Sequence, residues 1–159
     1  MPSLKATMRT AAVLAAAAAA SLTGYADARQ IYSDTADAHI EIQEALTTAA
    51  REHKRVILDF GGNWCGDCQV LDIYFHAPVN AGLLNENYVL VHVNIGRYDR
   101  NTDLAEKYGV PLKKGVPGLA VLDAHGRVLY SQKNGEFEAI RKMESSSVTD
   151  FLNKWKPKS

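Results

Sequence analysis

Cys65 and Cys68 are the only two cysteines in the chain, and their C-x-x-C spacing is the pattern best suited to chemistry. They come shortly after an apolar run at residues 56–60 and open a segment with helical periodicity. The first turn of a helix offers free backbone N–H groups and the positive end of the helix dipole, which together stabilise a thiolate. We therefore expect Cys65 to attack disulfides as a nucleophile and Cys68, one turn further along, to resolve the mixed disulfide.

A structural disulfide and a metal site are the two other uses of such a pair. A bridge across so short a loop removes little chain entropy, about 2 kcal/mol on the logarithmic scaling, so it braces a fold weakly. Tetrahedral zinc needs four ligands, and the histidines that would complete the set are scattered along the chain. We expect redox chemistry without a cofactor, and the alternative is a metal or haem-thiol chaperone that uses Cys65 and Cys68 as ligands.

The elements that must position this pair alternate along the chain. Apolar residues at helical spacing predict helices at residues 35–54, from the cysteines to about Tyr74, at 103–108 and at 148–155, with a short helical turn near Leu83. Apolar runs rich in β-branched residues predict buried strands at 56–60 and 88–95, and a hairpin at 119–122 and 128–131. This order predicts an α/β fold with a central mixed β-sheet flanked by helices.

The first 28 residues read as an export signal rather than as part of that fold. Lys5 and Arg9 precede an uncharged stretch at residues 10–22, and Ala26-Asp27-Ala28 has the small-x-small pattern that signal peptidase accepts. An uncleaved membrane anchor is the alternative, but the stretch is shorter than the roughly 20 residues that span a bilayer. We expect a signal peptide at 1–28, cleavage near Ala28, and a periplasmic or secreted protein.

Composition restricts the remaining possibilities. The whole chain has 159 residues, 47% of them hydrophobic, which suits one folded domain, expected at residues 29–159. Its 18 basic and 18 acidic side chains give a net charge of zero, so no electrostatic field draws in nucleic acid. We expect a monomer that binds no nucleic acid.

The sequence resembles the thioredoxin superfamily at three landmarks in the right order. Asp59-Phe60 and then Trp64-Cys65-Gly66-Asp67-Cys68 match the family's strand and active-site motif, and Gly115-Val116-Pro117 before residues 119–123 matches its cis-proline loop and following strand. The chain looks most like exported thioredoxin-like proteins and the periplasmic carboxy-terminal domain of the inner-membrane disulfide reductase. The resemblance implies a thioredoxin fold and reversible dithiol–disulfide exchange.

Three features depart from thioredoxin itself. Asp67 replaces the proline common between the cysteines, Ile73 stands at the kink proline, and residues 111–113 look inserted before the cis-proline loop. None of these changes touches the nucleophile, the resolving cysteine or Pro117. Asp67 would place a negative charge between the cysteines, which opposes the thiolate and favours a reducing couple.

Other residues are candidates to support the cysteines. Asp59 lies in an apolar strand, so its carboxyl group must be paired or protonated, and the resemblance gives it a proton-relay role beside Cys68. His92 could shuttle protons with Asp59 or simply be a half-buried strand histidine. Trp64 could cover the sulfur pair or pack on the sheet. The resemblance makes Pro117 cis, so that the Val116 backbone would pair with an extended substrate.

The function expected from these residues is thiol–disulfide exchange in the cell envelope, with a lean towards reduction. Its partners would be protein or small-molecule disulfides and a membrane-associated thiol donor. A disulfide-forming oxidase is a further alternative, because only the reduction potential separates it from a reductase.

Overall fold

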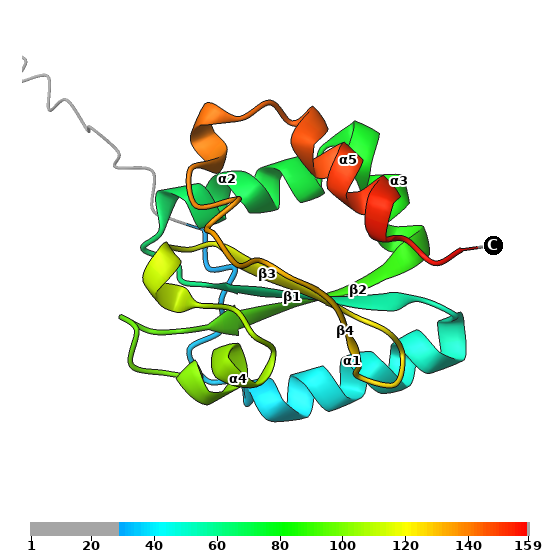
Figure 1. Cartoon of the computed structure of the whole chain (residues 1–159), viewed down its shortest axis with the longest axis horizontal. Coiled ribbons are helices and arrows are strands. Elements are labelled where there is room, and N and C mark those ends of the chain that lie inside the picture. Colours follow the sequence, from blue (N-terminus) through cyan, green and yellow to red (C-terminus); the bar gives the residue numbers. More distant parts are fainter. Residues whose placement is uncertain (1–28, 159) are drawn as a thin grey trace, which may run out of the picture.

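A four-stranded mixed sheet forms the middle layer of the molecule (Figure 1). The computed structural model describes residues 29–158, so the predicted signal peptide lies outside the described residues. The sheet order is β2-β1-β3-β4, in which β1 pairs with β2 in parallel and all other pairs are antiparallel. The strands are β1 (Arg55–Gly61), β2 (Tyr88–Asn94), β3 (Gly118–Leu122) and β4 (Val128–Ser131).

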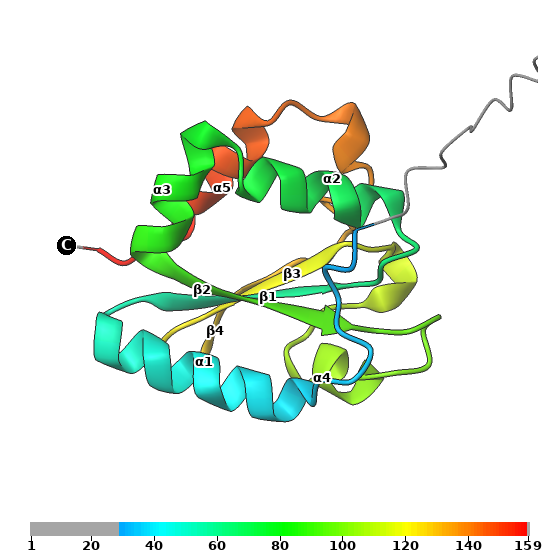
Figure 2. The same cartoon turned by 180° about the vertical axis from the view of Figure 1, so that it is seen from behind.

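Helices cover both faces of this sheet, as the two opposite views show (Figures 1 and 2). One face carries α1 (Ala38–Glu52) and α4 (Thr102–Lys107). The other carries α2 (Gly66–Phe75), α3 (Pro78–Asn87) and α5 (Ser146–Trp155). Two single turns of 3₁₀-helix, η1 (Leu112–Lys114) and η2 (Ile140–Lys142), lie in the connections on either side of the β3-β4 hairpin. The predicted α/β fold is therefore confirmed.

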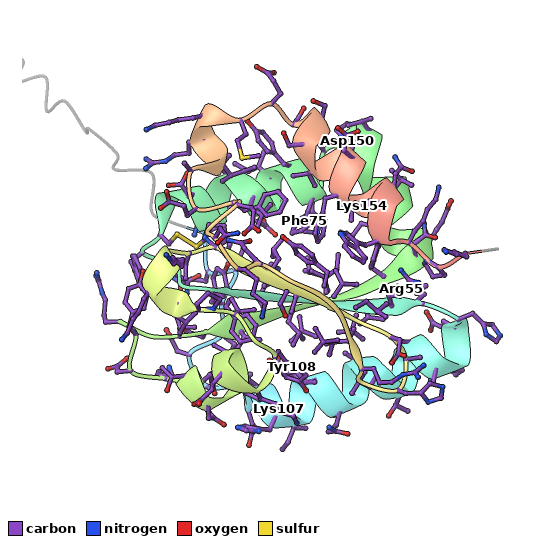
Figure 3. All side chains as sticks on the ribbon, in the orientation of Figure 1. Arg55, Phe75, Lys107, Tyr108, Asp150 and Lys154 are labelled. Atoms are coloured by element: carbon purple, nitrogen blue, oxygen red, sulfur yellow. A yellow bond between two sulfur atoms is a disulfide. The ribbon has the colours of Figure 1, made fainter. Side chains whose placement is uncertain are left out.

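The hydrophobic core consists of two layers, one on each side of the sheet. Phe75 reaches from α2 into one layer and Tyr108 from the end of α4 into the other, while Lys107 and Lys154 point outwards (Figure 3). Burial on both faces explains why β1 is a nearly continuous apolar run instead of an alternating one. The single carboxylate in this run, Asp59, is completely buried.

Local sequence explains the helix that precedes β1. The Asp37 carboxylate accepts hydrogen bonds from the backbone N–H groups of His39, at 2.9 Å, and Ile40, at 3.3 Å, and so caps α1. Four residues at helical spacing turn inwards from α1: Ala38, Ile42, Ala45 and Ala49. The helix ends at His53, which adopts the left-handed conformation of a C-cap.

The region after α2 differs from the prediction. The expected short turn near Leu83 is the ten-residue helix α3, which begins at Pro78. Proline is well suited to the first turn of a helix, where its missing N–H group is not needed. Only Asn80 and Leu84 of α3 are buried, so the apolar residues form no clear stripe and periodicity gives a weak signal.

No helix within residues 29–158 is long and apolar enough to cross a membrane.

Candidate active site

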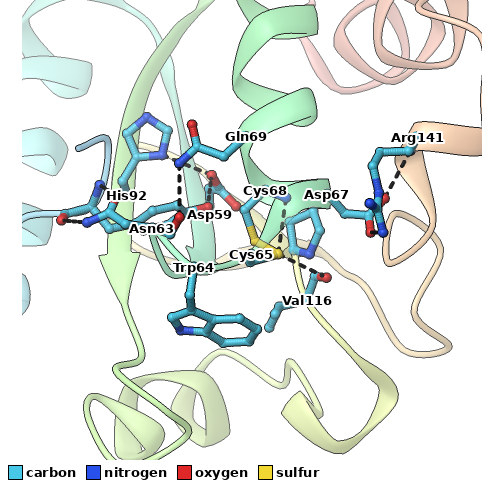
Figure 4. Close-up of a disulfide and its surroundings, with 12 residues drawn as sticks. Asp59, Asn63, Trp64, Cys65, Asp67, Cys68, Gln69, His92, Val116 and Arg141 are labelled. Carbon is cyan, nitrogen blue, oxygen red and sulfur yellow. Dashed lines mark hydrogen bonds and ion pairs between the residues drawn. A yellow bond between two sulfur atoms is a disulfide. The ribbon is translucent and has the colours of Figure 1, made fainter. Parts of the chain in front are cut away.

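The two cysteines form a disulfide where α2 begins (Figure 4). Cys65 is the N-cap of the helix, and its sulfur accepts a hydrogen bond from the backbone N–H of Cys68 at 3.1 Å. The Cα atoms are 5.2 Å apart, within the usual range for a disulfide. Cys65 is 6% exposed and Cys68 is completely buried, so an incoming molecule reaches Cys65 first.

The loop before β3 brings backbone atoms to the exposed sulfur. The Val116–Pro117 peptide bond is cis, and the carbonyl oxygen of Val116 lies 3.6 Å from Cys65 Sγ. The buried Gln132 side chain steadies this loop, because its amide group donates to the carbonyl of Pro117 at 3.0 Å and accepts from the N–H of Leu119 at 3.2 Å.

Trp64 packs against the loop after β2 rather than on the sheet. Its indole N–H donates to the carbonyl of Gly96 at 2.6 Å, and its ring centroid is 5.7 Å from that of Tyr98. The Arg97 guanidinium lies 5.1 Å from the indole centroid, at cation–π distance. The ring is held in place yet 39% exposed, on the side of the site where Val116 and Cys65 lie (Figure 4).

Asp59 is paired, as a buried carboxylate must be. Parallel pairing of β1 and β2 sets Asp59 opposite His92, and His92 Nδ1 lies 2.9 Å from Asp59 Oδ2. The hydroxyl of Tyr32 donates to the same oxygen at 2.7 Å. The other oxygen, Oδ1, is buried without a hydrogen-bond partner in the described part of the chain.

His92 also connects Asp59 to a second buried carboxylate, Asp72. His92 Nε2 lies 3.5 Å from Asp72 Oδ1, and Arg29 pairs with Asp72 Oδ2 at 2.9 Å. Burial on its own would lower the pKa of His92, but the hydrogen bond and charge of Asp59, followed by the charges of Asp72 and Glu41, outweigh it and raise this pKa. The imidazole therefore holds its proton to higher pH than an exposed histidine.

Three residues of this network lie outside the set expected from sequence. Asp72 lies one turn after Cys68 on the same helix, and that i, i+4 spacing is a signal that could have found it. Tyr32 and Asn63 have no such signal. The Asn63 side chain accepts from the N–H groups of Ile31 and Tyr32, both at 2.9 Å, and donates to the carbonyl of Tyr32, so it fixes the segment before α1 over the site.

Asp67 does not act alone between the cysteines. Its carboxylate pairs with the Arg141 guanidinium at 3.0 Å and accepts from the Arg141 backbone N–H at 3.0 Å. The guanidinium lies over Gly66, since a Cβ there would be 3.4 Å from Arg141 Nη1. The negative charge expected to oppose the thiolate is thus accompanied by a positive one.

An apolar groove of about 680 Å³ includes Tyr98, the residue that packs against Trp64, in its lining. Ala105 and Val110 line it from α4 and the following loop, and Leu112 of η1, four residues before Val116, lines it as well. Residues 111–113, which look inserted in the sequence, therefore shape this groove.

In residues 29–158 there is no group of three or more histidine, cysteine or acidic residues that could hold a metal ion.

A pair of sulfurs in this setting makes and breaks one disulfide reversibly, so the fold and the site together define a thioredoxin-type thiol–disulfide oxidoreductase. The chain belongs to the thioredoxin-like family, whose model matches residues 37–124. Two relatives are thioredoxins. Thioredoxin from Pongo abelii is 30% identical over 127 residues, which are 78% of this chain and 97% of that protein. Thioredoxin-3 from Dictyostelium discoideum is 36% identical over 62 residues, 38% of this chain and only 55% of the relative's length.

Solved structures agree with this assignment. A disulphide isomerase from Xylella fastidiosa has 36% sequence identity and a TM-score of 0.75, with 79% of this chain and 96% of that chain covered. The oxidised C-terminal domain of DsbD from Neisseria meningitidis has 18% identity and a TM-score of 0.56, with 75% and 96% covered. The second comparison shows likeness of fold. The predicted thioredoxin fold and superfamily are confirmed.

Proposed function

We propose that the protein is a cell-envelope thiol–disulfide oxidoreductase that works mainly as a reductase of protein disulfides. One observation carries the proposal: the Cys65 sulfur is the reachable one, at a helix amino terminus and 3.6 Å from the backbone carbonyl of Val116. An extended substrate can pair with that backbone while its sulfur meets Cys65.

The reaction proceeds in two steps. The Cys65 thiolate attacks one sulfur of the substrate disulfide, the substrate S–S bond breaks, and the other substrate sulfur leaves as a thiolate. The Cys68 thiol then loses its proton and attacks Cys65 Sγ, which releases the second substrate sulfur and forms the Cys65–Cys68 disulfide. Two electrons have passed to the substrate. A membrane-associated dithiol donor returns the pair to the reduced state.

Buried acid favours the reducing direction. Asp59 and Asp72 are both buried in the site. His92 and Arg29 pair with them and offset part of their charge, and the remaining negative charge opposes the formation of thiolate. A less stabilised thiolate makes the dithiol less favourable relative to the disulfide, so the couple becomes more reducing. A disulfide-forming oxidase needs the opposite arrangement.

The groove beside Val116 suits an apolar residue of the substrate. Leu112 in its lining is followed along the chain by the loop that faces Cys65, and Tyr98 in its lining packs against Trp64. A substrate strand paired with the Val116 backbone would place a neighbouring side chain there. We therefore propose that substrates carry an apolar residue near the reactive cysteine.

Cysteine variants test the proposal on the disulfides of insulin with dithiothreitol as donor. Cys65→Ser should abolish catalysed reduction, because the remaining sulfur, that of Cys68, is completely buried. Cys68→Ser should lose turnover but trap one substrate molecule as a mixed disulfide, visible on a non-reducing gel. Retained turnover in Cys65→Ser would refute the nucleophile assignment.

The direction is tested by equilibration of the couple with glutathione. We expect a potential nearer the value of about −270 mV for thioredoxin than the value of about −120 mV for a strong oxidase. A value near the oxidase end would favour the disulfide-forming alternative.

A further inference from the structure

Tyr32 is a buried titratable group that the two-step exchange does not use. Its side chain is 1% exposed, and it lies in the segment before α1. Its hydroxyl donates to the carboxylate of Asp59, which is 27 residues further along the chain. Its ring meets the His92 imidazole edge-on at 5.2 Å between centroids. An aromatic residue on a connecting segment is therefore placed inside the site.

The hydroxyl also borders the resolving sulfur. A Cβ atom on Gly61 would lie 2.5 Å from the Tyr32 hydroxyl oxygen and 2.7 Å from Cys68 Sγ. Both atoms thus face one small space, which stays open because residue 61 has no side chain. On its other side the hydroxyl is bonded to Asp59 Oδ2 at 2.7 Å. The oxygen of Tyr32 is therefore a near neighbour of the Cys68 sulfur and is also hydrogen-bonded to the Asp59 carboxylate.

The hydroxyl is not needed to hold its own segment. The Asn63 side chain fixes the backbone of Ile31 and Tyr32 by accepting two hydrogen bonds from their N–H groups and donating one to the Tyr32 carbonyl. Arg29 is anchored separately, by its ion pair with Asp72 and by a hydrogen bond from the Gln69 side chain to its carbonyl at 2.8 Å. The hydrogen bond of the hydroxyl therefore serves the Asp59 carboxylate and not the backbone of this segment.

We propose that the Tyr32 hydroxyl relays the proton of the Cys68 thiol to Asp59 during release of the substrate. As Cys68 attacks Cys65 Sγ, its S–H proton passes to the Tyr32 oxygen, and the Tyr32 O–H proton passes to Asp59 Oδ2. Tyr32 ends as it began, Asp59 becomes a carboxylic acid, and the substrate leaves as a thiolate. The inference rests on the proposed exchange reaction and assigns a residue to its second step.

The surrounding charges fit a neutral relay. Burial first, then the charge and hydrogen bond of Asp59 and the charge of Asp72, raise the pKa of Tyr32, so the hydroxyl keeps a proton to donate. The charged and titratable groups around it come from four elements and its own segment: Asp59 on β1, Cys68 and Asp72 on α2, His92 on β2 with Glu41 of α1 behind it, and Arg29 on its own segment.

Single-turnover reaction of the reduced protein with an aromatic disulfide such as Ellman's reagent separates the two steps, since each releases one coloured thiolate. Tyr32→Phe should leave the first phase unchanged and slow the second by about tenfold or more near neutral pH. Asp59→Asn should slow the same phase, and the double variant should be no slower than Asp59→Asn alone.

Tyr88→Phe is the matched control, because it also removes a buried hydroxyl. That hydroxyl donates to the carbonyl of Leu152 at 2.6 Å and lies far from the sulfurs.

The pH profile separates a relay from a packing defect. The gap between wild type and Tyr32→Phe should close towards about pH 9, where a thiol ionises without a relay. Gly61→Ala, which fills the shared space but keeps both partners, should also slow the second phase. Three outcomes would each refute the relay. The second-phase rate of Tyr32→Phe could be within about twofold of the wild-type rate, or the difference between the two rates could stay constant with pH. The rate losses of the two single variants could also multiply in the double variant. Because the assay needs no protein substrate, it can fail while insulin reduction by the wild type still supports the proposed function.

Discussion

A carboxylate in the central strand is tolerated here because it has partners on two sides. An unpaired charge at Asp59 would be expensive in a completely buried position. Tyr32 and His92 both contact Oδ2 and leave Oδ1 without a partner in the described residues. Such incomplete satisfaction is costly for a charged group, and the proposed relay would relieve it, because a proton on Oδ2 removes the charge of the whole carboxylate, including the unpartnered Oδ1.

His92 should make the stability of the protein depend on pH. Its pKa is raised in the folded state, so it binds its proton more tightly folded than unfolded. The stabilisation is therefore complete below its unfolded pKa of about 6.5 and is lost as the pH rises through the higher folded value. Urea unfolding at a series of pH values should show the free-energy difference between wild type and His92→Gln shrinking as the pH rises.

The control for this measurement is His39→Gln. That imidazole is exposed on α1, where it pairs with Asp103 at 3.2 Å. Its removal keeps every contact of His92, so it should keep the pH-dependent stabilisation that His92 provides. A wild-type advantage over His92→Gln that grows with pH would contradict a raised pKa of His92 in the folded protein.

At the scale of elements, α2 and the segment around η2 are joined beside the disulfide. Asp67 in the first turn of α2 holds both the guanidinium and the backbone N–H of Arg141. The pair spans 74 residues of sequence. It brings a positive charge over Gly66, between the two cysteines, and so offsets the acidic residue that replaces the usual proline.

This pair predicts opposite shifts of the reduction potential. Asp67→Asn leaves Arg141 unpaired near Cys65, which favours the thiolate and raises the potential. Arg141→Gln leaves Asp67 unpaired and should lower it. Each shift should be no more than about 20 mV, because Arg141 is 64% exposed and solvent screens the charges.

Glutathione equilibration of both variants measures these shifts. The double variant Asp67→Asn/Arg141→Gln should return close to the wild-type value, since it removes both charges. Shifts of the same sign in the two single variants would mean that they act through distortion of α2 instead of through charge.

Local sequence predicts most of the secondary structure, whereas it predicts the contacts around the cysteines only in part. The apolar run of β1 predicts a strand buried on both faces, and the helical spacing of apolar residues in α1 predicts which face of that helix is buried. The C-x-x-C pair directly follows β1 in the sequence, which predicts its position at the start of α2. The extent of α3 escapes prediction because proline is typical of a helix break, whereas Pro78 begins a helix. Neither Tyr32 nor Arg141 has a local signal, because each reaches the site only through the packing of distant segments.

At the scale of the whole molecule, the segment that follows the predicted signal peptide is part of the site. Arg29 pairs with Asp72 at 2.9 Å, and Tyr32 covers Asp59. A cut after Ala28 therefore keeps every contact that this segment makes with the buried acids, whereas a cut a few residues later would remove them. The predicted cut and the chemistry of the site are therefore compatible.

This compatibility predicts the mature amino terminus. Expressed in a Gram-negative host, the protein should be recovered from the periplasmic fraction with Arg29 as its first residue, which intact-mass measurement and amino-terminal sequencing would establish. Ala28→Lys, which removes the small residue before the cut, should leave the precursor uncleaved.

As a comparison, a chain that begins at Asp34 lacks Arg29 and Tyr32, so it should fold less stably and release substrate more slowly than a chain that begins at Arg29. An unprocessed protein held at the membrane would refute the cleavage and support the anchor alternative, and equal release rates for the two shortened chains would show that the segment takes no part in the site.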